Sequence, residues 1–240
     1  MQLNFDGIPI DELAIKLIQA YEPPEGYYLG FSGGKDSVVI EHLTRRAGVK
    51  VDSHYCVSPI DPPQIYAFIK DQYPQVIWDY HAKNFWNVHV MRHGLPTRLV
   101  RWCCEIIKES GGAGRVKILG MRKAESLGRS KYKCFDNHGK RGDWLLPILE
   151  WSDADVWQYI SEHDIPFSAL YRHGFKRIGC VLCPFAGKEE VKLSYELFPK
   201  IVQNWRLAAD RYIRERNTNS KRKPTTFKTG EEYFNWWIKR

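Results

Sequence analysis

Short apolar runs alternate along this chain with stretches in which apolar residues recur every three or four positions. Runs of the first kind are typical of buried strands, and they lie at residues 27–31, 49–57, 76–80, 116–121 and 144–148. Stretches of the second kind predict amphipathic helices, and they lie at residues 9–21, 36–47, 63–72, 84–92, 99–109 and 153–163. Strands that alternate with helices indicate an α/β fold, in which helices flank both faces of a parallel sheet.

The pattern changes after Pro184. Residues 188–198, 199–216 and 231–238 predict helices with no strands between them, and the polar, basic segment 217–226 predicts a linker. We therefore expect an α/β domain over residues 1–186 and a helical, basic C-terminal extension over residues 187–240. Residues 123–143 are polar, basic and glycine-containing, which predicts a mobile loop that covers a substrate.

The first predicted strand runs directly into a glycine turn and then a helix. The residues of the turn are Ser32, Gly33, Gly34, Lys35, Asp36 and Ser37. Two glycines let the backbone approach an anion closely, and the free N–H groups and dipole of a helix N-terminus favour negative charge. A lysine and two hydroxyls add further donors, so the sequence predicts a phosphate site. The spacing differs from that of a Walker A loop.

Two more polar residues follow predicted strands. Asp61 follows the second strand and Arg122 follows the fourth. Because ligands of such sheets bind beyond the carboxyl ends of the strands, we expect both residues to meet the glycine turn on one rim. Arg122 is then a candidate for a phosphate or sulfate contact, with a surface arginine as the alternative. For Glu125 we expect a salt bridge to Arg122.

Four cysteines form two local pairs. Cys103 and Cys104 are adjacent on a predicted helix, and Cys180 and Cys183 form a Cys-x-x-Cys sequence before Pro184. Four thiolates can hold an iron–sulfur cluster or zinc. Adjacent helical residues diverge by about 100°, which suits a large [4Fe–4S] cubane better than one small ion. Zinc and uncoordinated thiols remain the alternatives. Lys108, one helical turn after Cys104, is a candidate to approach the cluster or the substrate, with a solvated helix lysine as the alternative.

Composition narrows the class of protein. The chain has 240 residues, is 43% hydrophobic and carries a formal net charge of +8. A positive excess suits an anionic partner such as a nucleotide or a nucleic acid, and a basic, solvated surface is the plain alternative. No run of about 18 apolar residues occurs, so we expect no membrane span. The N-terminal residues do not resemble a secretory signal, so we expect a cytoplasmic protein whose cysteines are reduced.

The glycine turn resembles the PP-loop of the adenine nucleotide alpha hydrolases, and the chain as a whole resembles the phosphoadenosine phosphosulfate (PAPS) reductase family. The resemblance covers about residues 27–186. It is carried, in the family's order, by Ser32–Ser37, residues 60–63, Arg101-Trp102-Cys103-Cys104 with Lys108, Leu119–Arg122 with Glu125-Ser126, residues 147–151 with 155–157, and Leu170-Tyr171 through Ile178–Pro184. It implies a Rossmann-like (HUP-type) fold, and the two cysteine pairs match the members that carry a [4Fe–4S] cluster.

The resemblance also implies roles for the site residues. The PP-loop would hold the pyrophosphate of ATP or the phosphate of PAPS, with Lys35, Asp36 and Arg122 as the catalytic candidates and Asp36 orienting the loop or Mg²⁺. The cluster-bearing assimilatory reductases carry a catalytic cysteine in a C-terminal Glu-Cys-Gly-Leu-His motif. This chain has no cysteine after Cys183, so ordinary reductase activity would need Cys134 or a partner's thiol instead.

The leading hypothesis is therefore an enzyme of sulfur metabolism that uses ATP to adenylylate an acceptor, releases pyrophosphate and inserts sulfur, with a nucleic acid as a candidate acceptor and a sulfur-donor protein as a candidate partner. A PAPS or adenylyl sulfate reductase that uses an external thiol is the second hypothesis. A non-catalytic subunit that binds nucleotide or nucleic acid is the third. The oligomeric state is left open.

Overall fold

The computed structural model describes residues 7–139, 142–221 and 223–239. The described chain divides into two compact units, and the segments that form each unit alternate along the sequence. The first unit contains the residues up to Cys56, Gln64–Asp79 and Ser110–Tyr171, and the second contains Val57–Pro63, Tyr80–Glu109 and the residues from Arg172 on. The division into domains at residue 186 remains a prediction.

The first unit is built on a six-stranded sheet with the strand order β3-β2-β1-β4-β6-β5. Its strands are β1 (Tyr27–Gly30), β2 (Val51–Cys56), β3 (Ile77–Asp79), β4 (Lys117–Ile118), β5 (Phe135–Asn137) and β6 (Asp143–Leu145). All neighbouring pairs are parallel except β5 and β6. The chain moves outward from β1 to β3 and then returns to the other side of β1 with β4. The β1–β4 boundary is therefore the switch point at which ligands of open α/β sheets bind.

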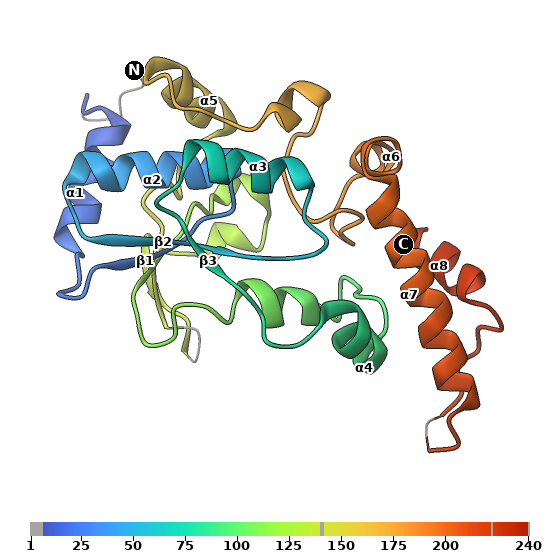
Figure 1. Cartoon of the computed structure of the whole chain (residues 1–240). Coiled ribbons are helices and arrows are strands. Elements are labelled where there is room, and N and C mark those ends of the chain that lie inside the picture. The colour runs from blue at the N-terminus through green and yellow to red at the C-terminus, as the bar shows by residue number, and fades with distance from the viewer. Residues whose placement is uncertain (1–6, 140–141, 222, 240) are drawn as a thin grey trace. The chain divides into compact units, whose positions relative to one another are not determined.

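The α-helices in the described part of this unit are α1 (Ile10–Ala20), α2 (Lys35–Ala47), α3 (Pro63–Gln72, its first residue excepted) and α5 (Asp153–Glu162). Helix α2 packs against both α1 and α5, and α1, α2 and α3 lie along one side of the strands (Figure 1). Val38, Val39, Ile40 and Leu43 are fully buried, which accounts for the helical apolar spacing in the sequence. Helix α2 ends at Gly48, whose φ of 69° is the left-handed conformation that favours glycine.

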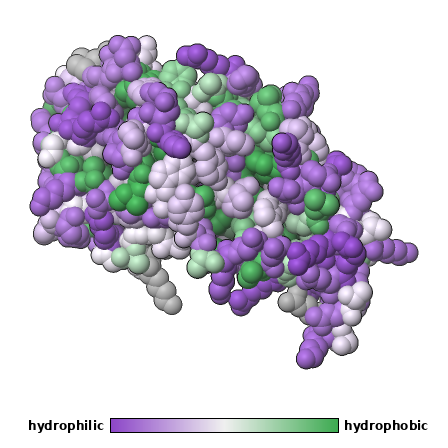
Figure 2. Space-filling view, in the orientation of Figure 1, coloured by the Kyte–Doolittle hydropathy of each residue, from purple (hydrophilic) through white to green (hydrophobic). Residues whose placement is uncertain are grey.

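The second unit is mainly helical. It contains the π-helical turns η1 (Phe85–Val90) and η2 (Cys104–Lys108) and the helices α4 (Met91–His93), α6 (Lys188–Leu197), α7 (Pro199–Thr218) and α8 (Gly230–Ile238). Helix α7 packs against α4, α6, α8 and η1. Over α7 and α8 the surface is mostly hydrophilic (Figure 2).

Trp205 forms the centre of the second unit's core. Only 1% of it is exposed, and its ring lies 4.9 Å from the rings of Trp86 and Trp237. Its indole Nε1 donates to the carbonyl oxygen of Val181 at 3.2 Å. Trp205 and Trp237 are therefore packing residues, because a buried indole offers no face on which a nucleobase can stack.

Most predicted helices and strands are confirmed. The structure differs from the prediction in the lengths of two elements and in the segment 123–143. The predicted strand at 116–121 is only two residues long in β4, and the predicted helix at 99–109 is mostly the π-helical turn η2. The segment 123–143 is not one long loop, because it contains two short 3₁₀ turns and strand β5. Residues 140–141 of that segment lie outside the described residues.

Candidate nucleotide site and cysteine site

The PP-loop lies at the switch point of the sheet, between the end of β1 and the start of α2. Gly33 has a φ of +69°, and a Cβ on it would lie 3.2–3.3 Å from the side chains of Ile65 and Ile69. Both observations favour glycine at this position. Gly34 is the residue before α2 and supplies no side-chain cap. The backbone N–H groups at the start of α2 are therefore not covered by a capping side chain of that residue.

Hydroxyl groups hold the loop in shape. Ser37 Oγ donates to the carbonyl oxygen of Gly34 at 2.8 Å and lies 3.3 Å from Ser32 Oγ. The backbone N–H of Lys35 donates to the hydroxyl of Tyr171 at 2.7 Å. The two serines therefore fasten the turn internally. The hydroxyl of Tyr171 accepts a hydrogen bond from the backbone amide of Lys35 in the loop. Only the family resemblance had pointed to Tyr171.

Two cations and two carboxylates meet beside the loop. Lys35 Nζ lies 3.2 Å from Asp36 Oδ2 and 3.2 Å from Asp153 Oδ1. Arg122 donates from Nε to Asp36 Oδ1 and from Nη2 to Asp153 Oδ1, each at 2.7 Å. The side chains of Lys35 and Arg122 are 4% and 2% exposed, whereas that of Asp153 is 62% exposed. The predicted association of Arg122 with the loop is thus present, and Arg122 is buried rather than a surface arginine.

The network differs from the sequence expectation in its acidic members. Glu125 Oε2 accepts from the backbone N–H of Arg122 at 3.1 Å and pairs with Arg129. The expected salt bridge from Glu125 to the guanidinium was wrong, since Asp36 and Asp153 hold that group. Asp153 was not among the residues predicted for this site. Its role was not visible in the sequence, because it depends on α5 starting beside the end of β4.

The pKa of the Asp153 carboxyl reflects these contacts. Partial burial on its own raises this pKa, but the charge of Lys35 and the hydrogen bonds from Arg122 and Lys35 outweigh burial and hold it below the ordinary value. Asp153 is therefore ionised at neutral pH, and the four charges of the network sum to zero. Any anion that binds here must interact with cations that already have internal partners.

Asp61 and Lys108 belong to the second unit, where they pair with each other. Lys108 Nζ lies 3.7 Å from Asp61 Oδ1. The pKa of Lys108 is raised, first by the charge of Asp61 and then by that of Cys180. Lys108 is therefore next to a cysteine, as expected. The participation of Asp61 and Lys108 in nucleotide binding remains a prediction.

The four predicted cysteine ligands all lie in the second unit. Cys103 and Cys104 stand at the start of η2. Cys180 and Cys183 lie on a tight turn in which the N–H of Cys183 donates to the carbonyl oxygen of Cys180 at 3.1 Å. Leu182 within this turn has a φ of 58°. This conformation is rare for a branched residue and closes the turn so sharply that the two cysteines of the pair come together.

The thiols influence one another electrostatically. A hydrogen bond from the Cys103 thiol lowers the pKa of Cys104; burial opposes this, and contacts with Arg101 lower the pKa further. The same hydrogen bond, together with burial, raises the pKa of Cys103. Electrostatic interactions with Cys180 and Cys183 raise this pKa further. The two pairs are therefore neighbours in space. A deprotonated thiol at Cys104 is the form that binds soft metals.

These residues fit an iron–sulfur cluster by their chemistry and by their proximity. However, no three His, Cys, Asp or Glu side chains among the described residues are placed to hold a single metal ion. A cubane is larger than one ion and binds thiolates that are farther apart. The [4Fe–4S] cluster therefore remains a prediction, with zinc as its alternative.

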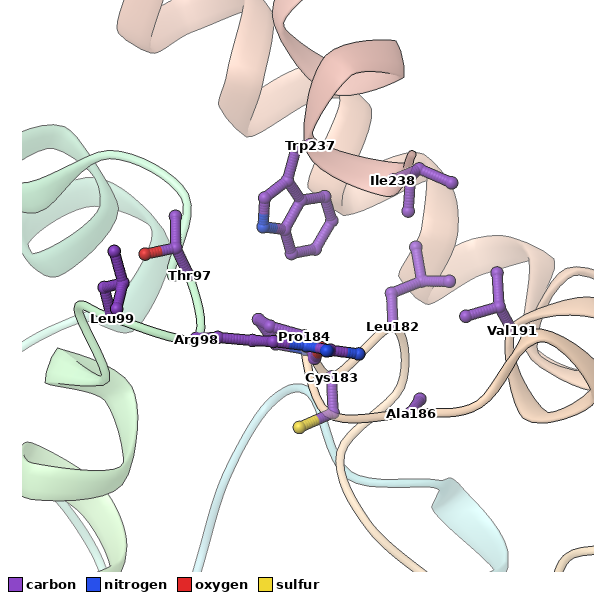
Figure 3. Close-up of a pocket in the computed structure, with 10 residues that line it drawn as sticks. All are labelled: Thr97, Arg98, Leu99, Leu182, Cys183, Pro184, Ala186, Val191, Trp237 and Ile238. Atoms are coloured by element: carbon purple, nitrogen blue, oxygen red, sulfur yellow. The ribbon is translucent and has the colours of Figure 1, made fainter. Parts of the chain in front are cut away.

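A cavity of about 210 Å³ adjoins the Cys180–Cys183 turn. Figure 3 shows that Trp237 forms one wall, opposite Arg98, Cys183 and Pro184. Arg98 is held there because its Nε donates to the carbonyl oxygen of Pro184 at 2.8 Å. The cavity is mostly apolar with one guanidinium, so it suits a small ligand better than a nucleotide.

An α/β sheet with a PP-loop at its switch point defines the class of protein, and comparison with known proteins gives the family. The model of the phosphoadenosine phosphosulfate reductase domain matches residues 26–186. The chain belongs to this family. None of the helices in the described part of the chain is long and apolar enough to cross a membrane.

Three relatives illustrate the range of the family. An uncharacterized protein of Methanocaldococcus jannaschii is 31% identical over 204 residues, which cover 79% of this chain and 42% of the relative. A probable FAD synthase of Caenorhabditis elegans is 29% identical over 178 residues, covering 70% and 32%. An adenosine 5'-phosphosulfate reductase of Oceanobacillus iheyensis is 26% identical over 204 residues, covering 74% and 81%. The chain spans less than half the length of the first two relatives.

A solved structure confirms the fold. The PAPS reductase of Candida auris, determined as a phosphate complex, superposes with a TM-score of 0.53 and 18% identity, covering 75% of this chain and 97% of that protein. The Rossmann-like architecture predicted from the sequence is therefore confirmed.

Proposed function

We propose that this protein binds an adenine nucleotide in the PP-loop and a [4Fe–4S] cluster on Cys103, Cys104, Cys180 and Cys183, and that it activates an acceptor with ATP for sulfur transfer. The main observation in support is that Lys35 and Arg122 converge at the N-terminus of α2, at the switch point of the sheet. Two buried cations and a helix dipole together favour a polyphosphate.

In this proposal, an oxygen or nitrogen of the acceptor attacks the α-phosphorus of ATP. The bond from that phosphorus to the bridging oxygen breaks, and pyrophosphate leaves with its electron pair. Lys35 and Arg122 stabilise the charge that develops on the leaving group, and Asp36 orients both cations through the contacts described above. Mg²⁺ enters with the nucleotide as part of the substrate, as is usual for phosphate-bound magnesium.

The ATP-dependent reaction has support from a relative. A probable FAD synthase matches 70% of this chain, and its product FAD contains an adenylyl group, the group that the first step proposed here transfers. The cluster, held by the four cysteines, would supply iron bound to thiolate and sulfide next to Lys108. A sulfur-donor protein then supplies sulfide-level sulfur, which attacks the adenylylated acceptor, and AMP leaves with the electron pair of the broken bond. A nucleic acid is the proposed acceptor. The acceptor has the weaker support, because Arg211 and Arg214 of the basic helix α7 already pair with acids of the same helix.

Reduction of PAPS or adenylyl sulfate is a second candidate, favoured by the adenosine 5'-phosphosulfate reductase that matches 74% of the chain. In that reaction a thiolate attacks the sulfur atom, the nucleotide leaves, and a second thiol releases sulfite while a disulfide forms. Cys134 is poorly suited to the first step, since it packs against a buried cluster that includes Trp144, and burial raises its pKa. This candidate therefore requires the thiol of a partner.

One experiment distinguishes the two candidates. Protein purified without oxygen is incubated with Mg²⁺, a thiol reductant and either ATP or PAPS, and pyrophosphate, AMP and sulfite are measured. Pyrophosphate and AMP from ATP, lost in Lys35→Ala and retained in the matched variant Lys16→Ala on the exposed face of α1, would support the proposal. Sulfite from PAPS would support the reductase instead. Equal ATP turnover in Lys35→Ala would overturn the assigned site.

A further inference from the structure

We propose that Asp153 is an internal occupant of the anion site: its carboxylate holds the place on Lys35 and Arg122 that a phosphate of the nucleotide takes, and it swings away when the nucleotide binds. This inference rests on the proposed function of the PP-loop. It goes further by assigning to Asp153 a role in setting the affinity for the polyphosphate and in releasing the pyrophosphate product.

The geometry of one oxygen atom carries the argument. Asp153 Oδ1 alone bridges both cations, at 3.2 Å from Lys35 Nζ and 2.7 Å from Arg122 Nη2. An oxyanion of a phosphate makes the same kind of bridge when it binds between a lysine and an arginine. Asp153 therefore occupies the position that is most favourable for a ligand oxygen.

The exposure of the four side chains shows which of the two carboxylates can leave. The cations are almost completely buried, and Asp36 is 20% exposed. Asp153 is 62% exposed, so it lies between the cations and the solvent. An anion that arrives from solvent meets Asp153 first, whereas Asp36 supports the cations from within.

Asp153 is also not needed to start helix α5. The helix is capped by Ser152, whose Oγ accepts from the N–H of Asp155, and by Asp155, whose Oδ2 accepts from the N–H of Ser152. These two reciprocal bonds satisfy the first donors of the helix. Because the cap does not involve the side chain of Asp153, that side chain can rotate into solvent without loss of the helix N-terminus.

The charge balance gives this movement a consequence. With Asp153 in place the network is neutral, and with Asp153 displaced it has one net positive charge to offer the ligand. The carboxylate thus weakens the binding of every anion at this position, and it returns to the cations when pyrophosphate departs. A competitor of this kind prevents a strongly basic site from retaining its product.

The test measures the binding of inorganic pyrophosphate by titration calorimetry to the wild-type protein, Asp153→Asn, Asp153→Ser and Glu162→Gln. Glu162→Gln removes the same charge from the opposite end of α5 and is the matched control. We expect both Asp153 variants to bind pyrophosphate roughly three- to tenfold more tightly than wild type, as for the loss of one competing ion pair, and Glu162→Gln to be unchanged. The serine variant serves if the asparagine variant does not fold.

The outcomes separate this inference from the proposed function. If the wild-type protein binds pyrophosphate and neither Asp153 variant binds it more tightly, the inference is wrong and the PP-loop site stands. If no variant binds pyrophosphate or ATP, both are wrong. An equal gain in Glu162→Gln would show that only the net charge of the protein matters, and would also overturn the inference.

Discussion

Arg122 and Asp36 are 86 positions apart in the chain, and a hydrogen bond of 2.7 Å joins Nε of the first to Oδ1 of the second. This bond connects the segment after β4 to the first turn of α2, across the boundary where the strand order reverses. It fixes the guanidinium beside the PP-loop, so the site has its positive charge in position before any ligand arrives.

Replacing Arg122 by methionine should weaken both the fold and the site. The change keeps a side chain of similar length, but it leaves Asp36 and Asp153 without the guanidinium. Because both carboxylates are partly exposed and can be solvated, we expect a loss of about 1–3 kcal/mol in the free energy of unfolding, below the value for a fully buried pair. Urea denaturation measures this loss. Arg122→Lys keeps the positive charge but cannot donate to both carboxylates as the guanidinium does. Its free energy of unfolding should lie between those of wild type and Arg122→Met. Unchanged stability in Arg122→Met would contradict the assigned role of the ion pairs.

Gly120 determines how closely β4 approaches the PP-loop helix. A Cβ on Gly120 would lie 2.9 Å from the backbone carbon and oxygen of Asp36, which is too close for a non-bonded contact. We expect Gly120→Ala to move the start of α2, to destabilise the protein by about 1–3 kcal/mol, and to weaken ATP binding. Thermal unfolding and calorimetric titration measure the two effects. Gly128→Ala is the control, because the nearest atom to its Cβ would be 4.0 Å away. Equal behaviour of the two variants would contradict the packing argument.

The sequence predicts the parts of this molecule that depend on local patterns. Helix α3 was predicted over the same residues that it occupies, and the helix predicted at 153–163 is present as α5. The PP-loop was found because strand, glycine turn and helix follow one another within a short stretch. Its association with Arg122 was predictable because both follow parallel strands.

The features that the sequence did not predict depend on contacts between residues that are distant in the sequence. Strand β5 was missed because Phe135–Asn137 is short and gains its structure only by pairing with β6. The part played by Asp153 was missed because it needs the lengths of β4 and of the segment before α5, which no periodicity reveals. Tyr171 is 136 positions away from Lys35, whose backbone amide donates a hydrogen bond to the Tyr171 hydroxyl. Only the family resemblance pointed to Tyr171.

His42 should make the protein sensitive to mild acid. Burial, followed by repulsion from His163, Arg45 and Arg46, lowers its pKa from 6.5 to about 4. Since the unfolded chain binds the proton more readily, the contribution of His42 to stability is complete above pH 6.5 and is lost as the pH falls toward 4. After allowance for solvent screening of this half-buried group, we expect a loss of about 1 kcal/mol.

Urea denaturation at several pH values between 7 and 5 measures this loss. In His42→Gln the stability should change less over that interval than in wild type. His173→Gln, an exposed histidine of the second unit, is the control and should retain the wild-type pH dependence. A pH dependence that is the same in His42→Gln and wild type would contradict the lowered pKa.

The proposed cluster gives the sharpest test of the second unit. Protein prepared without oxygen should contain about four irons per chain and show the broad visible absorption of thiolate-bound iron. Cys103→Ser should lose most of both, since the Cys103 thiol is buried and hydrogen-bonded to Cys104, and a serine oxygen is a poor ligand for a soft iron–sulfur centre. Cys134→Ser is the matched control, because Cys134 packs in the hydrophobic cluster of the first unit, and it should keep its iron. Full iron in Cys103→Ser would rule out this ligand set, whereas loss in both variants would point to misfolding, which far-UV circular dichroism detects.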